Sequence, residues 1–222
     1  SNEVEWIGPQ SEYRPTEYVQ GWMHFWFDGQ KRLNVAKRFQ TERINFLTDT
    51  WSNDSFFADN QFYPDDMEIN SSLNDYKEKI QSVPRVPDLL SLEAALTKLL
   101  YKYAAKKTGF SGFRRDRSSN DKANRLLNHG NYLAYGLAAS VLWVLGIPHG
   151  FAVMHGKTRK GALVFDLADL IKDAIILPLS FICAKKSYSD QEFRRHCTQS
   201  FVNHKALDFM FNVTKDVALS TF

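Results

Sequence analysis

Three polar residues interrupt apolar segments in the second half of this 222-residue sequence. His155 follows an apolar run, and Asp166 and Asp169 lie within the apolar stretch "ALVFDLADLIKDAII". In a helix the two carboxylates share one face, and like charges that close resist joint ionisation unless a cation compensates them. Capping of a helix N-terminus explains one of the two aspartates. Both together, with His155 just upstream, favour a metal site.

Glu93 supplies a third carboxylate, on a helix that the spacing of leucines predicts over residues 88–107. Three leucines form an apolar stripe that includes position 93: Leu89, Leu96 and Leu100. From this helix alone, the favoured interpretation is an edge position, with Glu93 reaching solvent or Lys98. The alternative is a buried carboxylate, which must be paired, protonated or bound to a metal.

The four candidate residues together supply hard oxygen ligands and one imidazole: Glu93, His155, Asp166 and Asp169. This donor set favours Mg²⁺ or Mn²⁺ over structural Zn²⁺, which prefers thiolates and more histidines. Such an ion polarises a phosphate and activates the attacking oxygen in phosphodiester chemistry. We therefore expect Mg²⁺ or Mn²⁺ as the cofactor and a phosphodiester as the substrate.

Basic segments offer surfaces for an anionic partner. The segment "KKTGFSGFRRDR", residues 106–117, has two phenylalanines among its cations, which are Lys106, Lys107, Arg114, Arg115 and Arg117. It either follows a nucleic-acid backbone or is an ordinary solvated loop, and both interpretations stay open. The turn after His155 adds Lys157, Arg159 and Lys160, which either bind a phosphate or are an ordinary solvated turn. Another basic helix face is predicted from Lys31, Arg32, Lys37, Arg38 and Arg43.

Composition and periodicity predict an all-α fold. Hydrophobic residues make up 44% of the chain, enough for a substantial core, and two cysteines exclude a disulfide scaffold. Helices are predicted over residues 15–46, with a break near Gly29, and over 88–107 and 119–145. Residues 48–72 have little periodicity and are expected to be loop with short helical pieces. The stretch holding Asp166 and Asp169 is either a strand turning into a helix or a buried helix.

The segment 131–148 is the most apolar part of the sequence. Charges flank it and Gly136 interrupts it, so we expect a central core helix rather than a membrane span. Its residues Tyr132, Leu142 and Leu145 are expected to be buried. A Ser-x-x-Glu capping box at Ser189 predicts the start of a later helix.

Three longer pieces carry a resemblance to a known family: "SLEAALTKLLYKYA", "DKANRLLNHGNYLAYGLAASVLWVLGIPHGFAVMHG" and "GALVFDLADLIKDAII". In this order and spacing they resemble the CRISPR adaptation integrase, the larger of the two proteins that insert new spacers into CRISPR arrays. The resemblance extends over residues 4–222 and looks most like the type I-F (Ypest) branch. Family members begin with a β-rich domain, so residues 1–14 are assigned to its last strand and linker, and 15–222 to the helical catalytic domain.

The resemblance implies that Glu93, His155 and Asp169 bind the divalent metal and that Asp166 is needed for catalysis. Asn124 and Tyr132 match the helix beside the site. The implied reaction is attack of a DNA 3′-hydroxyl on a phosphodiester at the repeat boundary, and water as nucleophile gives endonuclease cleavage. The implied partners are prespacer and CRISPR repeat DNA, a second copy of the chain in a homodimer, and the small adaptation protein, fused in this branch to a helicase–nuclease. The resemblance implies a location in the prokaryotic cytoplasm, without membrane association.

Two other classes of function fit the sequence. One is a non-catalytic DNA-binding or assembly module whose acidic cluster is structural. The other is a hydrolase of small phosphate esters, which predicts a closed pocket in place of an open basic surface. Convergence of Glu93, His155 and Asp169 on one point favours the integrase, whereas a ligand held away from the others favours the module.

Overall fold

The helices of this chain pack around one hydrophobic core. The computed structural model describes residues 16–62, 64, 67–156 and 160–220. In chain order the elements are α1 (Glu17–Trp26), α2 (Gly29–Asn53), α3 (Ser55–Asp59), α4 (Met67–Ser82), α5 (Val86–Thr108), α6 (Lys122–Leu145), α7 (Ala162–Ile171), the π-helical turn η2 (Lys172–Ile176), α8 (Leu177–Lys185), α9 (Asp190–Asn203) and α10 (Ala206–Leu219). No strand occurs in the described residues, which confirms the all-α prediction. The strand expected near residues 3–6 lies outside them.

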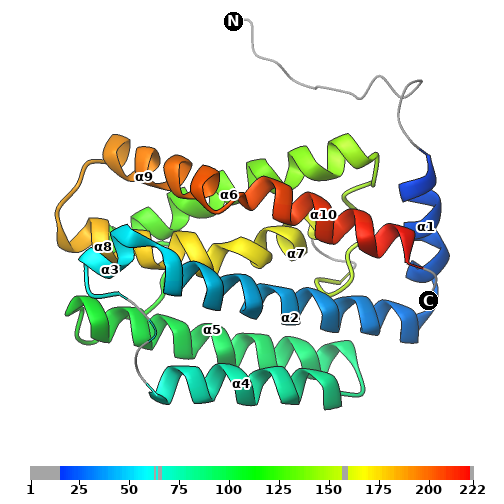
Figure 1. Ribbon diagram of the computed structural model, residues 1–222, viewed down its shortest axis with the longest axis horizontal. Coiled ribbons are helices and arrows are strands. Elements are labelled where there is room, and N and C mark those ends of the chain that lie inside the picture. Colours follow the sequence, from blue (N-terminus) through cyan, green and yellow to red (C-terminus); the bar gives the residue numbers. More distant parts are fainter. Residues whose placement is uncertain (1–15, 63, 65–66, 157–159, 221–222) are drawn as a thin grey trace, which may run out of the picture.

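The long helix α2 lies across the middle of the bundle. Figure 1 shows α4 and α5 along one side of it and α10 along the other. In the continuous run of α7, η2 and α8, the elements α7 and η2 also pack on α2, and α6 packs on the whole run. Because α2, α5 and α7 meet in this way, side chains far apart in the sequence reach one central space.

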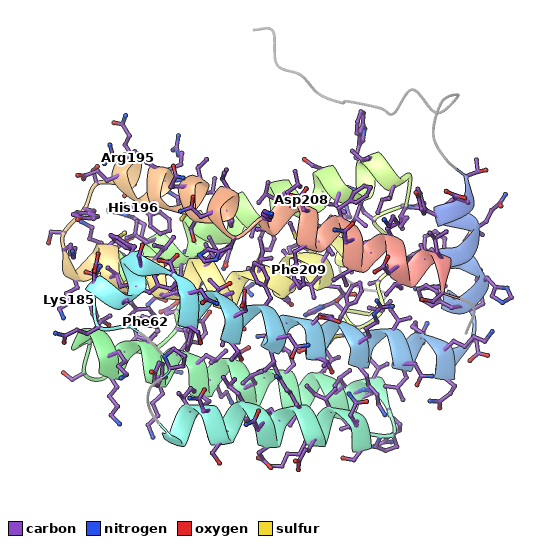
Figure 2. The ribbon with its side chains drawn as sticks, in the orientation of Figure 1. Phe62, Lys185, Arg195, His196, Asp208 and Phe209 are labelled. Atoms are coloured by element: carbon purple, nitrogen blue, oxygen red, sulfur yellow. The ribbon has the colours of Figure 1, made fainter. Side chains whose placement is uncertain are left out.

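Close contacts fix the positions of the outer helices α1 and α10, and of α6 against η2. Phe209 of α10, labelled in Figure 2, stacks on Phe46 of α2, with ring centroids 4.3 Å apart. At Gly21, α1 lies so close to α10 that a Cβ there would come within 1.8 Å of the Ala218 carbonyl oxygen. At Gly130, a Cβ would lie 2.4 Å from Ile176 of η2. Larger side chains at these two glycines are therefore incompatible with the packing.

Several expected boundaries are wrong. Residues 48–53 continue α2, and α4 already begins at residue 67, so much of the expected loop is helical. The stretch with Asp166 and Asp169 is helical, not a strand, and the capping box of Ser189 and Glu192 is confirmed. None of the helices formed by the described residues is long and apolar enough to span a bilayer.

The expectation for α6 is only partly right. Leu142 and Leu145 are fully buried, as predicted, but Tyr132 is 74% exposed. The outer face of α6 near Tyr132 is not covered by another described helix, and the Tyr132 ring instead makes an edge contact with Tyr135 at 6.0 Å. A nearly apolar helix does not reveal from its sequence which face lacks a neighbour.

Candidate metal centre

Asp166 and Asp169 lie beyond the first turn of α7. The helix begins at Ala162, after Gly161 in a left-handed conformation, so neither aspartate caps it. Both are buried, with exposed fractions of 2% and 7%. Their presence therefore needs partners within the protein, and the capping explanation is wrong.

Asp166 orients the imidazole of His155. Nδ1 of His155 lies 2.6 Å from Oδ1 of Asp166. The same carboxylate accepts hydrogen bonds from the backbone amides of Val153, Met154 and His155 at 2.7, 3.0 and 3.1 Å. The hydrogen bond to Asp166 raises the pKa of His155 above its usual value. A carboxylate can only accept here, so Nδ1 carries a proton, and in the neutral form of the ring Nε2 is the nitrogen that can act as a ligand.

This geometry connects Asp166 to His155. Both of its oxygens are engaged by the segment 153–155, so it holds His155 in place and does not itself face a substrate. A carboxylate behind a histidine in this way is typical of metal sites, where it fixes the tautomer and orientation of the ligand. Asp166 is accordingly a positioning residue.

Glu93 contacts Arg43, and the edge interpretation with Lys98 is wrong. Its Oε1 accepts from Arg43 at 2.9 Å and from the Thr97 hydroxyl at 3.1 Å. Arg43 itself is only 2% exposed, so it does not belong to the basic helix face predicted for it. A guanidinium this deeply buried must be surrounded by acceptors, which here come from several helices.

Asp169 pairs with Lys172 one turn further on. The ammonium of Lys172 contacts Oδ1 of Asp169, and Asp173 follows at once, bonded to Arg43 Nε at 2.7 Å. Burial opposes ionisation of Asp169, but Lys172 and Arg43 hold its pKa below the ordinary value. Asp169 is therefore an ionised carboxylate inside the fold.

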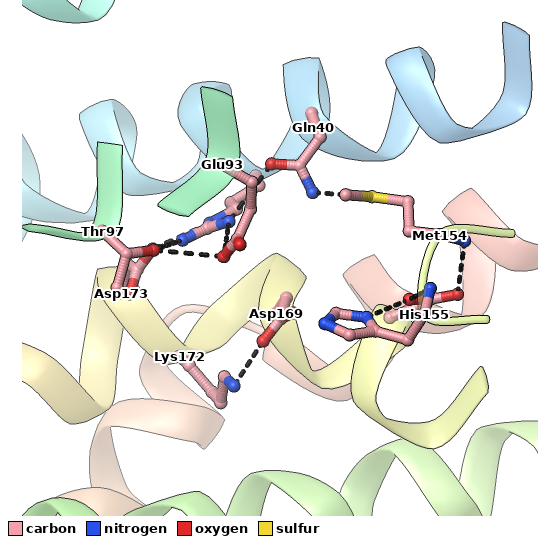
Figure 3. Close-up of polar contacts among 10 residues, drawn as sticks. Gln40, Glu93, Thr97, Met154, His155, Asp169, Lys172 and Asp173 are labelled. Carbon is pink, nitrogen blue, oxygen red and sulfur yellow. Dashed lines mark hydrogen bonds and ion pairs between the residues drawn. The ribbon is translucent and has the colours of Figure 1, made fainter. Parts of the chain in front are cut away.

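The predicted ligands converge only in part. Glu93 and Asp169 line one small cavity of about 50 Å³, whereas His155 lines a different one. Figure 3 shows the His155 ring turned toward Asp169, with Glu93 on the other side of the space. Within the described residues, no three His, Cys, Asp or Glu side chains are already arranged to hold a metal ion.

The charges nevertheless fit a divalent cation. The centre contains two cations, Arg43 and Lys172, and four carboxylates, which are Glu93, Asp166, Asp169 and Asp173. This leaves a formal charge of −2 when the imidazole is counted as neutral. The oxygen-rich donor set with one nitrogen suits Mg²⁺ or Mn²⁺, and an ion would compete with Lys172 for Asp169.

Two tryptophans of α1 hold the segment that carries His155. Nε1 of Trp22 donates to the Phe151 carbonyl at 3.0 Å, and Nε1 of Trp26 donates to the Ala152 carbonyl at 2.8 Å. The indoles are four residues apart and so share one face of α1. The close packing of α1 on α10 at Gly21 thus supports His155 indirectly.

A basic groove of about 670 Å³ begins beside this centre. Tyr101 lines both the groove and the small cavity with Glu93. Five cations line the groove: Lys98, Lys102 and Lys106, spaced by four along α5, and Arg114 and Arg115. Of the predicted DNA-binding residues, Lys106, Arg114 and Arg115 are therefore brought together. Lys107 instead lies over the ring of Tyr103, and Arg117 is exposed outside the groove lining.

The loop of this groove is tied to the core. Phe110 and Phe113 contact Phe181, with ring centroids 5.7 and 4.7 Å apart, so these rings are not presented for stacking on bases. Arg115 donates to the side chains of Asn124 and Asn128 at 2.8 and 2.6 Å. Lys160 is exposed, whereas Lys157 and Arg159 lie outside the described residues.

Sequence reasoning missed several residues of the centre. Lys172 and Asp173 are charges in an apolar run, the same signal that identified Asp169. Arg43 carried a weaker signal, because it shares a helix stripe with Leu33, Ala36 and Leu47. Thr97 and the α1 tryptophans carried none, since their roles depend on contacts distant in sequence.

Fold and site define an all-α domain with a buried carboxylate–histidine centre next to a basic groove. The sequence profile of the family described as "CRISPR associated protein Cas1" matches residues 11–212. The chain therefore belongs to the Cas1 family, which confirms the family predicted from the sequence.

Relatives and solved structures agree with this assignment. A CRISPR-associated endonuclease Cas1 from Pseudomonas aeruginosa (strain UCBPP-PA14) is 49% identical over 218 residues, which cover 97% of this chain and 67% of the relative. One from Pectobacterium atrosepticum is 47% identical over 217 residues, with the same coverage of both chains. A Cas1 protein from Thermotoga maritima has the same fold, with a TM-score of 0.73 at 16% identity, covering 98% of this chain and 75% of that one. A TtCas1–DNA complex gives a TM-score of 0.68 at 19% identity, covering 97% and 67%.

Proposed function

We propose that this chain is the catalytic domain of a divalent-metal-dependent DNA endonuclease and integrase that inserts spacers into CRISPR arrays. The observation that carries the proposal is the pair of His155 and Asp166. An Nδ1–H directed at a carboxylate leaves Nε2 as a metal-ligand nitrogen, beside the carboxylates of Asp169 and Glu93. The near relatives are named as endonucleases, and one structural neighbour was solved with DNA.

The residues have separate roles in this proposal. Glu93, His155 and Asp169 hold Mg²⁺ or Mn²⁺, and Asp166 fixes His155. When bound, the ion supplies Lewis-acid stabilisation of a phosphodiester and activation of the attacking hydroxyl or water. The groove lined by Lys98, Lys102, Lys106, Arg114 and Arg115 holds the DNA backbone. Tyr132, exposed on α6 and in contact with Tyr135, offers a ring on which a base can stack.

The partners belong to the same proposal. We infer binding of prespacer and repeat DNA, a homodimer, and association with the small adaptation protein fused to a helicase–nuclease. Membership of the Cas1 family supports these partners, whereas the contacts within this chain bear only on the DNA.

One observation favours the second candidate, a DNA-binding module without catalysis. Glu93 and Asp169 are each paired with a cation of the protein itself, and no three ligands among the described side chains are preassembled. A hydrolase of small phosphate esters is disfavoured, because the cavity beside Glu93 holds only about 50 Å³, far below a typical ligand pocket, and adjoins an open groove.

A strand-transfer and cleavage assay with Mn²⁺ tests the proposal. The wild-type chain is compared with His155→Ala and with His149→Ala, which changes an exposed histidine of the same loop. We expect metal-dependent products from the wild type and His149→Ala, and none from folded His155→Ala. DNA binding without products in all three proteins supports the module instead.

A further inference from the structure

Arg43 lies at the centre of a buried hydrogen-bond network that joins the segments carrying the three predicted ligands. Its side chain is 3% exposed and contacts four residues: Gln40, Glu93, Thr97 and Asp173. Figure 3 labels these four partners, which belong to α2, α5 and η2, and marks their contacts with dashed lines. The proposed function gives this guanidinium no role.

The first connection sets the orientation of Glu93. Arg43 NH1 donates to Oε1 of Glu93 at 2.9 Å, and the Thr97 hydroxyl donates to the same oxygen at 3.1 Å. Thr97 in turn accepts from NH2 of Arg43 at 2.8 Å. Because both bonds engage Oε1, the carboxylate is held in one rotamer and Oε2 is the oxygen left for a cation.

The second connection reaches the segment after Asp169. Nε and NH2 of Arg43 both contact Oδ2 of Asp173, which lies in the π-helical turn directly following α7. Turns of this kind often occur at functional sites, where they adjust the direction of side chains. The ion pair with Asp173 therefore fixes the end of α7 relative to Glu93.

The third connection reaches His155. NH1 of Arg43 donates to Oε1 of Gln40 at 3.1 Å, and Nε2 of Gln40 contacts the Met154 sulfur at 3.1 Å. Met154 precedes His155 and also donates its amide to Asp166. A single guanidinium is thus linked to all three segments that carry the predicted ligands. A lysine ammonium lacks the planar fork of donors and cannot make the same set of contacts.

We propose that Arg43 is a positioning residue, which sets the relative placement of Glu93, Asp169 and His155 for the divalent cation. This inference rests on the proposed metal site. Arg43 acts through the geometry of its hydrogen bonds as well as through its charge, because a positive charge alone at position 43 would repel the cation. Lysine at this position keeps the charge and loses the fork, so it is expected to weaken metal binding.

Calorimetric titration of the full chain with Mn²⁺ tests this, with the melting temperature measured alongside. The variants are Arg43→Lys and Thr97→Val, the latter removing one hydroxyl while keeping the size of the side chain. Arg38→Lys serves as the matched control on the same helix, at a half-buried arginine 3.8 Å from Asp216. We expect at least a tenfold loss of Mn²⁺ affinity in Arg43→Lys, a smaller loss in Thr97→Val, and no change in the control.

The outcomes separate the two proposals. If the wild type binds no Mn²⁺, the proposed function fails and the positioning role fails with it. Wild-type binding together with unchanged affinity in folded Arg43→Lys and Thr97→Val overturns the positioning role alone. A lower melting temperature with unchanged affinity has the same meaning, because it assigns Arg43 to stability only. If Arg43→Lys does not fold, unchanged affinity in Thr97→Val overturns the inference by itself.

Discussion

The imidazole of His155 and the carboxylate of Asp166 form a pair 2.6 Å apart in which the histidine is directed by the aspartate. Asp166 is buried and also accepts hydrogen bonds from three backbone amides, so it fixes both the imidazole ring and the segment that carries it. The pair explains why an apolar helix contains two aspartates three residues apart. Asp169 faces the proposed ion, whereas Asp166 lies behind its histidine ligand.

Asp166→Asn is expected to weaken Mn²⁺ binding about 10–100-fold, as is usual when a carboxylate behind a metal-bound histidine is lost. An amide can present its NH₂ to Nδ1 and so favour the wrong tautomer of His155. The measurement is Mn²⁺ affinity by calorimetry, with Asp49→Asn as an exposed control on α2. Equal affinity in Asp166→Asn and wild type contradicts the positioning role.

Trp26→Phe is expected to loosen the His155 segment. The change removes the 2.8 Å hydrogen bond to the Ala152 carbonyl and keeps an aromatic ring, at a cost of about 1 kcal/mol in the free energy of unfolding. Faster amide hydrogen exchange in residues 151–156 is the predicted signature. Trp51→Phe removes a similar bond, to the Ala174 carbonyl, and is expected to leave exchange in that segment unchanged. Identical amide exchange in Trp26→Phe and wild type would contradict the role of Trp26 in holding the His155 segment.

The basic groove is expected to carry most of the affinity for DNA. Replacing Lys98, Lys102 and Arg114 by alanine should reduce the slope of log affinity against log salt by up to about three, since each lost phosphate contact lowers it by about one. The affinity for DNA of unrelated sequences should fall by the same factor. In the matched triple variant, Lys31, Lys37 and Arg38 on α2 are replaced by alanine. Lys37 already donates a hydrogen bond to the Gln81 carbonyl. A larger change of slope in the α2 variant places the DNA path there instead.

Asp54→Ala is expected to lower stability at neutral pH by about 1–2 kcal/mol, because Asp54 caps α3 and pairs with His204 at 2.7 Å. Burial opposes ionisation of Asp54, but hydrogen bonds from His204 and the Phe57 amide hold its pKa below the ordinary value. A lowered folded-state pKa gives stability that is present above the unfolded value of 3.8 and is lost as the pH falls through the folded value. Urea unfolding should therefore show the difference between wild type and variant shrinking below about pH 4. A constant difference across this range contradicts the assignment.

Local patterns predicted the candidate ligands, and tertiary contacts were needed to find the residues that contact them. The apolar run of α7 was enough to single out Asp169, whereas the leucine stripe of α5 alone favoured an edge position for Glu93, whose ligand role followed from the family resemblance. Arg43 resembled its partly exposed basic neighbours on α2, because its acceptors Glu93 and Asp173 lie 50 and 130 residues away. The exposure of Tyr132 could not be predicted, because α6 is apolar both on the faces that other helices cover and on one face that they do not.

The central claim is that His155, Glu93 and Asp169 hold one divalent cation, and pulsed electron paramagnetic resonance of the Mn²⁺-loaded chain tests it most directly. A manganese ion bound to Nε2 of His155 shows a strong coupling to a directly coordinated ¹⁴N nucleus. We predict this coupling in the wild type and in His149→Ala, and its loss in His155→Ala. Bound Mn²⁺ without nitrogen coupling in the wild type, or with the same coupling in His155→Ala, would contradict the account.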